Sequence, residues 1–192
     1  MSYKIKNGEM VRTGKRRPLT LYHFTFPRIL PEIIKNGIYP FAKKDNAYML
    51  PGAAAIWLTS NPKGNQITEA YFAWIRKHGN RNLIAQCEAG RQFIFGCNDS
   101  GVSARITVQL PRNFEGLFNY LELIRYQNFP LASFVAEMPG VADWWVVASP
   151  ADSDSFLGIG PGAITAVQSV GDPSPEYLAA VEQITAECER AA

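Results

Sequence analysis

The 192-residue chain has no apolar run long enough for a membrane helix. Although 47% of its residues are hydrophobic, no stretch approaches the roughly 18 consecutive apolar residues that a spanning helix needs. The charged start of the chain runs into no apolar segment, so a secretory signal is not expected. Only three cysteines are present, and their spacing indicates no disulfide framework. These absences predict a soluble, cytoplasmic protein without a membrane partner.

Histidine is scarce too, which narrows the search for a catalytic site. The only two histidines, His23 and His78, do not have zinc-ligand spacing with Cys87 and Cys97. No metal site is therefore predicted. A glycine-rich phosphate loop that ends in Lys-Ser or Lys-Thr is also missing. A cysteine nucleophile acting with His23 stays open, although no local signature supports it.

The net charge of +2 is unevenly distributed along the chain. Residues 1–18 contain six basic residues and one acidic residue, which gives +5 and leaves −3 for the remainder. The six basic residues are Lys4, Lys6, Arg12, Lys15, Arg16 and Arg17. A basic arm of this kind suits contact with nucleic-acid phosphates. The alternative is a solvated chain end without a binding role.

Hydrophobic periodicity predicts one α+β domain over residues 19–192. Residues with period-2 alternation or β-branched and aromatic enrichment predict strands; these are 19–26, 55–59, 83–87, 92–95, 104–110, 144–148 and 163–170. Helices are predicted from Pro31 to Asn36, over 67–78 and 114–126, and from Ser174 onward. The last of these begins with Ser174 as N-cap and has Tyr177, Val181, Ile184 and Cys188 on its expected buried side. Short strands without βαβ alternation favour α+β over a doubly wound sheet.

One segment resembles a known family. Tyr22-His23-Phe24-Thr25, followed by the residues from Ile29 to Ile38, is similar to the opening of ADP-ribosyltransferase-like proteins. The nearest resemblance is to DarT-type DNA-modifying toxins and to RNA 2′-phosphotransferases, and it extends over residues 20–75. It implies a split antiparallel β-sheet core with short flanking helices and NAD as substrate. It also implies that His23 hydrogen-bonds the ribose next to nicotinamide, with Thr25 on the same strand face.

The next strand and helix extend the resemblance. Ile56-Trp57-Leu58-Thr59-Ser60 and the later Tyr71 are similar to the strand and helix that form the nicotinamide wall in this family. The resemblance implies Thr59 or Ser60 as the hydroxyl at the strand end. It implies Tyr71 as the aromatic side chain against the pyridinium ring, a cation–π contact of about 0.5–2 kcal/mol.

The family's late glutamate has no obvious counterpart, because the chain has no Glu-x-Glu or Gln-x-Glu motif. Two candidate acids are Glu137, which lies among apolar residues and is expected to be partly desolvated, and Asp143, which precedes a strand. An acid elsewhere, or none, stays open. Arg105 is the strand arginine expected to grip phosphate if the chain is similar to the phosphotransferases. Arg28 is either a pyrophosphate ligand or a surface charge.

Three functions follow from this pattern. The first is an NAD-dependent ADP-ribosyltransferase acting on a macromolecule, with DNA or RNA favoured over protein because of the basic arm. The second is a non-catalytic module on the same fold that binds a nucleotide, nucleic acid or protein. The third is an NAD-dependent RNA 2′-phosphotransferase. The sequence does not distinguish a toxin from a phage-defence or housekeeping role, nor does it give the oligomeric state.

Overall fold

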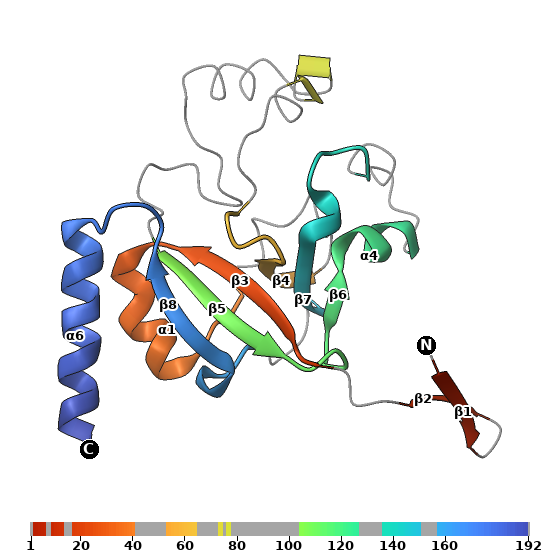
Figure 1. Ribbon diagram of the computed structural model, residues 1–192, viewed down its shortest axis with the longest axis horizontal. Helices are drawn as coiled ribbons and strands as arrows, with labels where there is room; N and C mark the ends of the chain where they lie inside the picture. Colours follow the sequence, from red (N-terminus) through yellow and green to blue (C-terminus); the bar gives the residue numbers. More distant parts are fainter. Residues whose placement is uncertain are drawn as a thin grey trace.

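An antiparallel sheet forms the centre of the molecule, with helices α1 and α6 on one side of it and α4 at the β6-β7 end (Figure 1). The structure of the chain is a computed structural model, which describes residues 2–6, 9–13, 17–40, 53–64, 73–74, 76–77, 104–126, 136–150 and 157–191. In the part of the chain that the structure describes, all strand pairs are antiparallel and helices are few, which confirms the predicted α+β class. No described helix is both long and apolar enough to cross a membrane.

The main sheet has six antiparallel strands in the order β6-β7-β4-β3-β5-β8. Their bounds are β3 Leu19–Thr25, β4 Ala53–Thr59, β5 Ala104–Leu110, β6 Leu117–Asn119, β7 Trp144–Pro150 and β8 Ile164–Ser169. Along β5 the burial alternates, with Ala104, Ile106, Val108 and Leu110 fully buried and the residues between them more exposed. This period of two is the signal by which the sequence predicted the strand.

The centre of the sheet is held by a single residue pair. β3 pairs with β5 from Leu19 to Thr25, and β4 pairs with β7 over its whole length. Between β3 and β4, however, the only register pair is Tyr22 with Thr59. The sheet therefore consists of two three-stranded halves, β6-β7-β4 and β3-β5-β8, which are joined by little backbone pairing at the seam between β3 and β4.

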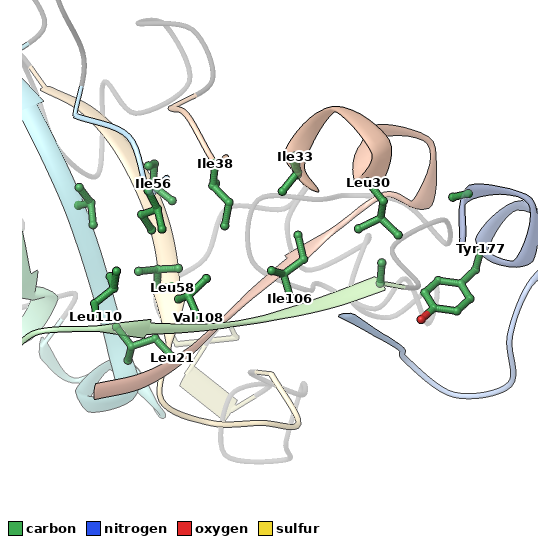
Figure 2. Packing of buried hydrophobic residues seen from close by; sticks show 14 residues of the cluster. Leu21, Leu30, Ile33, Ile38, Ile56, Leu58, Ile106, Val108, Leu110 and Tyr177 are labelled. Atoms are coloured by element: carbon green, nitrogen blue, oxygen red, sulfur yellow. The ribbon is translucent and has the colours of Figure 1, made fainter. Parts of the chain in front are cut away.

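One face of the sheet is covered by α1 (Leu30–Asn36) and α6 (Pro175–Ala191). Figure 2 shows Leu30 and Ile33 of α1 directed toward Ile106 of β5, with Tyr177 of α6 beside them. Gly37 ends α1 with φ at +98°. The Cβ of any other residue at this position would collide with the carbonyl oxygen of Ile159. The predicted helix and its Asn36-Gly37 stop are thus confirmed.

The opposite face of the β6-β7-β4 half is covered by α4 (Tyr120–Tyr126). An aromatic trio forms the centre of this layer: Tyr120 stacks on Trp144 at 5.7 Å between ring centres, and Trp57 meets Tyr120 edge-on at 4.9 Å. Tyr120 and Trp144 are almost completely buried. This layer holds β4 rigidly on the side of the seam that carries Trp57 and Thr59.

Two predicted elements differ from the structure. The helix predicted over 114–126 begins only at Tyr120, because Leu117–Asn119 pairs with β7 as a strand. On α6, Tyr177 and Ala180 are buried and Ile184 packs against the core, whereas Val181 and Cys188 are exposed. The strands predicted over 83–87 and 92–95, and all of 67–78 except residues 73–74 and 76–77, lie outside the described residues.

The N-terminal arm contains a hairpin that sequence reasoning did not predict. β1 (Ser2–Lys6) and β2 (Glu9–Thr13) pair antiparallel from Ser2↔Thr13 to Lys6↔Glu9. They form a two-stranded sheet of their own. Figure 1 places this hairpin beyond the end of the six-stranded sheet, on the side opposite α6.

Candidate functional site

His23 lies at the seam where the two halves of the sheet separate. It is the residue after Tyr22, whose pairing with Thr59 is the single register contact between β3 and β4. Its Nδ1 is 3.0 Å from the carbonyl oxygen of Trp57 on the other side of the seam. Since a carbonyl oxygen only accepts, Nδ1–H is the donor, and a side chain bridges the strands where the backbone pairing stops.

The protonation state of His23 follows from this environment. Burial lowers the pKa of the His23 imidazole below its ordinary value of 6.5, and the bond to the Trp57 carbonyl offsets this only in part. The ring is therefore neutral at pH 7. With the proton on Nδ1, the lone pair lies on Nε2, which no described residue hydrogen-bonds. The residue thus presents one acceptor to a hydroxyl group, such as that of a ribose.

Thr25 and Thr59 lie near this position but on opposite faces of the sheet. Thr25 is two residues beyond His23 and shares its face, and it is buried at 3% exposure. Thr59 pairs with Tyr22 and therefore lies on the other face. Its Oγ1 accepts a hydrogen bond from the Asn61 amide at 3.0 Å, which closes the turn after β4. The structure brings Thr25 to His23 but turns Thr59 away from it.

Ser60 and Asp143 form a polar pair at the same level of the sheet. Ser60 Oγ donates to the Asp143 carboxylate at 3.1 Å, and the Ser60 amide donates to the Asp143 carbonyl at 2.8 Å. The pair arises because Thr59 faces Trp144 across β4 and β7, so the next residue of one strand meets the preceding residue of the other. Asp143 ends the short 3-10 turn η2 (Val141–Asp143) and is half-buried.

The distance between His23 and Asp143 is set by the sheet. Tyr22, Thr59 and Trp144 stand side by side on β3, β4 and β7, so two strand spacings, roughly 10 Å, separate the outer two. β4 is antiparallel to both β3 and β7. Ser60 and Asp143 therefore lie on one side of the row formed by these three residues, and His23 lies on the other side. A ligand that contacts both groups must span the seam.

Glu137 does not have the burial that the sequence predicted. Its side chain is 60% exposed, and its carboxylate is 4.0 Å from the ammonium group of Lys77, itself 70% exposed. The expectation of a partly desolvated carboxylate at Glu137 is therefore wrong, because most of its side chain is open to solvent. The other candidate acid, Asp143, is held beside β4 by the hydrogen bond from Ser60.

Arg105 lies on the face of the sheet opposite His23. It pairs with Phe24 and Gln168 across β5, and its guanidinium carbon is 5.2 Å from the centre of the Tyr22 ring. One Nη donates to the carbonyl of Pro62 and the other to Oε1 of Gln168. Its two terminal nitrogens thus tie the turn after β4 to the β3-β5-β8 half. The guanidinium therefore has fewer N–H groups left for the bidentate phosphate contact that the sequence suggested.

The remaining predicted residues contribute little to this arrangement. Arg28, in the 3-10 turn η1 (Pro27–Ile29), is exposed and lies 5.0 Å from the Phe26 ring. Tyr71 is outside the described residues. Among the residues that are described, no three His, Cys, Asp or Glu side chains are grouped as metal ligands.

Sequence reasoning missed two partners in this site. The Trp57 carbonyl that fixes His23 is a backbone atom, which no side-chain pattern reveals. The bond between Ser60 and Asp143 joins residues 83 positions apart. Its only sequence signal is that one residue follows a predicted strand and the other precedes one, which becomes informative only once β4 and β7 are known to pair.

Comparison with protein-family models, with curated proteins and with solved structures finds no match for this chain. The candidate site therefore stands on its own geometry and on the resemblance of the segment around His23.

Proposed function

We propose that the chain is an NAD-dependent ADP-ribosyltransferase that acts on a macromolecule. The observation that supports this most is the placement of His23: a neutral imidazole, fixed through Nδ1 to the Trp57 carbonyl at the seam between β3 and β4, with its Nε2 lone pair left for a ribose hydroxyl. The resemblance of Tyr22-His23-Phe24-Thr25 to ADP-ribosyltransferase-like proteins gives the same residue the same role.

In the proposed reaction the bond between the ribose C1′ and nicotinamide breaks, and nicotinamide takes the bonding electrons. An oxygen or nitrogen of the acceptor then bonds to C1′ and loses its proton. The ribose carries developing positive charge at the transition state, so a fixed carboxylate nearby stabilises it. We assign this carboxylate to Asp143, whose orientation is set by the hydroxyl of Ser60 and which a substrate bound at His23 reaches only by spanning the seam.

The test is release of nicotinamide from NAD, measured with duplex and single-stranded DNA, RNA, 2′-phosphorylated RNA and cell lysate as acceptors. We expect release that depends on one acceptor class and falls by about 10²–10³-fold in His23→Ala, the scale of a lost transition-state hydrogen bond. Release that strictly requires 2′-phosphorylated RNA would instead indicate the phosphotransferase. Exposed Arg112, on the turn after β5, provides the control Arg112→Ala.

A binding module without turnover is the second candidate. It is favoured by one observation: Glu137 is exposed and Asp143 stands across the seam from His23, so the described acids do not converge on the histidine. Such a module shifts its melting temperature with NAD or a related nucleotide but consumes none. Folded wild-type protein that shows this shift, and no nicotinamide release with any acceptor, establishes the module and rejects the transferase.

A further inference from the structure

The net charge of the molecule resides at its two chain ends. Residues 1–18 carry +5, and α6 carries four glutamates against one arginine, which gives −3. All other residues together contain twelve basic and twelve acidic side chains and are neutral. Figure 1 shows the N-terminal hairpin and α6 at opposite ends of the long axis. The two ends of this axis therefore carry opposite net charges, with the positive charge at the hairpin end.

The positive end is also a free-standing ribbon. Among the described strands, β1 and β2 pair only with each other. In the sequence they are separated by Asn7-Gly8, a dipeptide that is typical of two-residue hairpin turns. A lone two-stranded hairpin is at best marginally stable in water. A ribbon that pairs with no described strand of the main sheet and carries a net positive charge is suited to a partner that supplies both a surface and negative charge.

We propose that the basic N-terminal arm docks, through its β1–β2 ribbon, in the major groove of duplex DNA. The major groove of B-form DNA, about 12 Å wide, admits a two-stranded β-ribbon, whose strands are about 4.8 Å apart. The deep, narrow major groove of A-form RNA does not. The negative charge of α6 at the far end turns the molecule so that its hairpin end meets the phosphates first.

This inference names duplex DNA as the acceptor class and in that respect rests on the proposed function. The binding itself is measured without NAD, so its failure and the failure of the transferase are separate results. DNA binding without nicotinamide release rejects the transferase alone. Nicotinamide release with a protein or RNA acceptor, in protein that does not bind DNA, rejects the ribbon proposal alone.

The experiment is fluorescence anisotropy with the full chain and a labelled 20-base-pair DNA duplex, repeated over a series of salt concentrations. The test variant replaces the six basic residues of the arm by glutamine: Lys4→Gln, Lys6→Gln, Arg12→Gln, Lys15→Gln, Arg16→Gln and Arg17→Gln. The control variant replaces three exposed basic residues of the body: Lys63→Gln, Arg76→Gln and Lys77→Gln. Thermal melting checks that all three proteins are equally folded.

For wild type we expect log Kd to rise with log salt with a slope of up to about 5, since six basic residues release about 0.9 counterions per phosphate contacted. The arm variant is expected to lose at least about tenfold in affinity at low salt and most of the slope. The body variant keeps most of both. Duplex DNA is expected to compete better than single-stranded DNA or duplex RNA.

Three results overturn the proposal. One is equal binding by wild type and the arm variant, and another is equal or tighter binding of single-stranded DNA or duplex RNA. The third is a light-scattering mass showing that the arm holds two copies of the chain together and that neutralising it yields monomers without any effect on DNA binding.

Discussion

At the scale of single residues, the imidazole of His23 joins β3 to β4 through the bond between its Nδ1 and the Trp57 carbonyl. The sequence singled it out because only two histidines exist and because its neighbours resemble a family motif. The structure adds what residue identity alone does not contain: the backbone partner of Nδ1 and the burial that keeps the ring neutral. Its tautomer is decided by an atom of Trp57, 34 residues away in the chain.

The lowered pKa of His23 predicts how stability depends on pH. Above the ordinary pKa of 6.5, the ring is neutral in both folded and unfolded chains and contributes no pH dependence. As the pH falls below this value, the unfolded chain binds a proton that the folded chain does not, so the free energy of unfolding decreases. The decrease stops at the lower, folded pKa.

This dependence is measured by urea unfolding of wild type and His23→Asn between neutral and mildly acidic pH. We expect the free energy of unfolding to fall more steeply in wild type, because the variant lacks the titrating group. Parallel pH profiles for the two proteins would show that His23 has the same pKa in both states and contradict the burial argument.

Glu137 and Asp143 show why the acid was not decided by sequence. Apolar neighbours in the chain suggested a desolvated Glu137, yet burial depends on which distant segments cover a residue, and Glu137 is exposed. Asp143 gave no stronger signal than any residue before a strand. Its hydrogen bond to Ser60 exists because two strands from distant parts of the chain are neighbours in the sheet.

At the scale of elements, strands with clear alternation were predicted well and the irregular ones were not. The strands that became β3, β4, β5, β7 and β8 all lie within a few residues of their expected positions. Leu117 has helical spacing with later residues, but pairing with Val147 makes it part of β6. On α6 the buried stripe runs through Ala180, whose small side chain gave no hydrophobic signal.

The N-cap of α6 provides a test of local stability. Ser174 Oγ accepts a hydrogen bond from the Tyr177 amide at 3.1 Å, which satisfies one of the free donors at the helix start. Ser174→Ala is expected to lower the free energy of unfolding by about 1 kcal/mol, whereas Ser174→Asp, which also caps, stays close to wild type. Equal unfolding midpoints in urea for all three proteins would show that this cap does not stabilise the fold.

Substitution of Arg105 tests whether this residue has a structural role or a ligand-binding role. Its bonds to the Pro62 carbonyl and to Gln168 connect the turn after β4 with β5 and β8. Arg105→Gln is therefore expected to lower the free energy of unfolding by about 1–2 kcal/mol in the absence of any ligand. Arg112→Gln, on an exposed turn, is the matched control and should leave stability within about 0.5 kcal/mol.

The same pair of variants tests the phosphate role that the sequence suggested. If Arg105→Gln is as stable as wild type but has lost affinity for a 2′-phosphorylated RNA, the arginine serves a ligand rather than the fold. That outcome would contradict a stabilising role for the bonds from Arg105 to the Pro62 carbonyl and to Gln168.

At the scale of the whole molecule, the sequence predicted the α+β class but not the strand order. Order and register follow from long-range pairing, such as β4 with β7, which carries no local signal in the chain. The seam between β3 and β4 also carries no local signal. It exists because these two predicted strands share only one register pair. The uneven distribution of charge, in contrast, was visible in the sequence. The structure adds that the hairpin and α6 lie at opposite ends of the long axis.

The central claim is that the Nε2 atom of His23 acts on NAD while Nδ1 serves the fold, and two amide substitutions separate these atoms. Asparagine reaches the position of Nδ1 and can donate to Trp57, but it leaves nothing at Nε2. Glutamine reaches the outer position without the inner bond. His23→Asn is therefore the informative variant, and His23→Gln is its complement.

The most direct measurement is nicotinamide release from NAD by wild type, His23→Asn and His23→Gln, each with its melting temperature. We predict that wild type releases nicotinamide, that His23→Asn melts near wild type but loses about 10²-fold or more of the rate, and that His23→Gln is the less stable of the two variants. Wild-type rates in folded His23→Asn, or no release by wild type with any acceptor, would contradict the account.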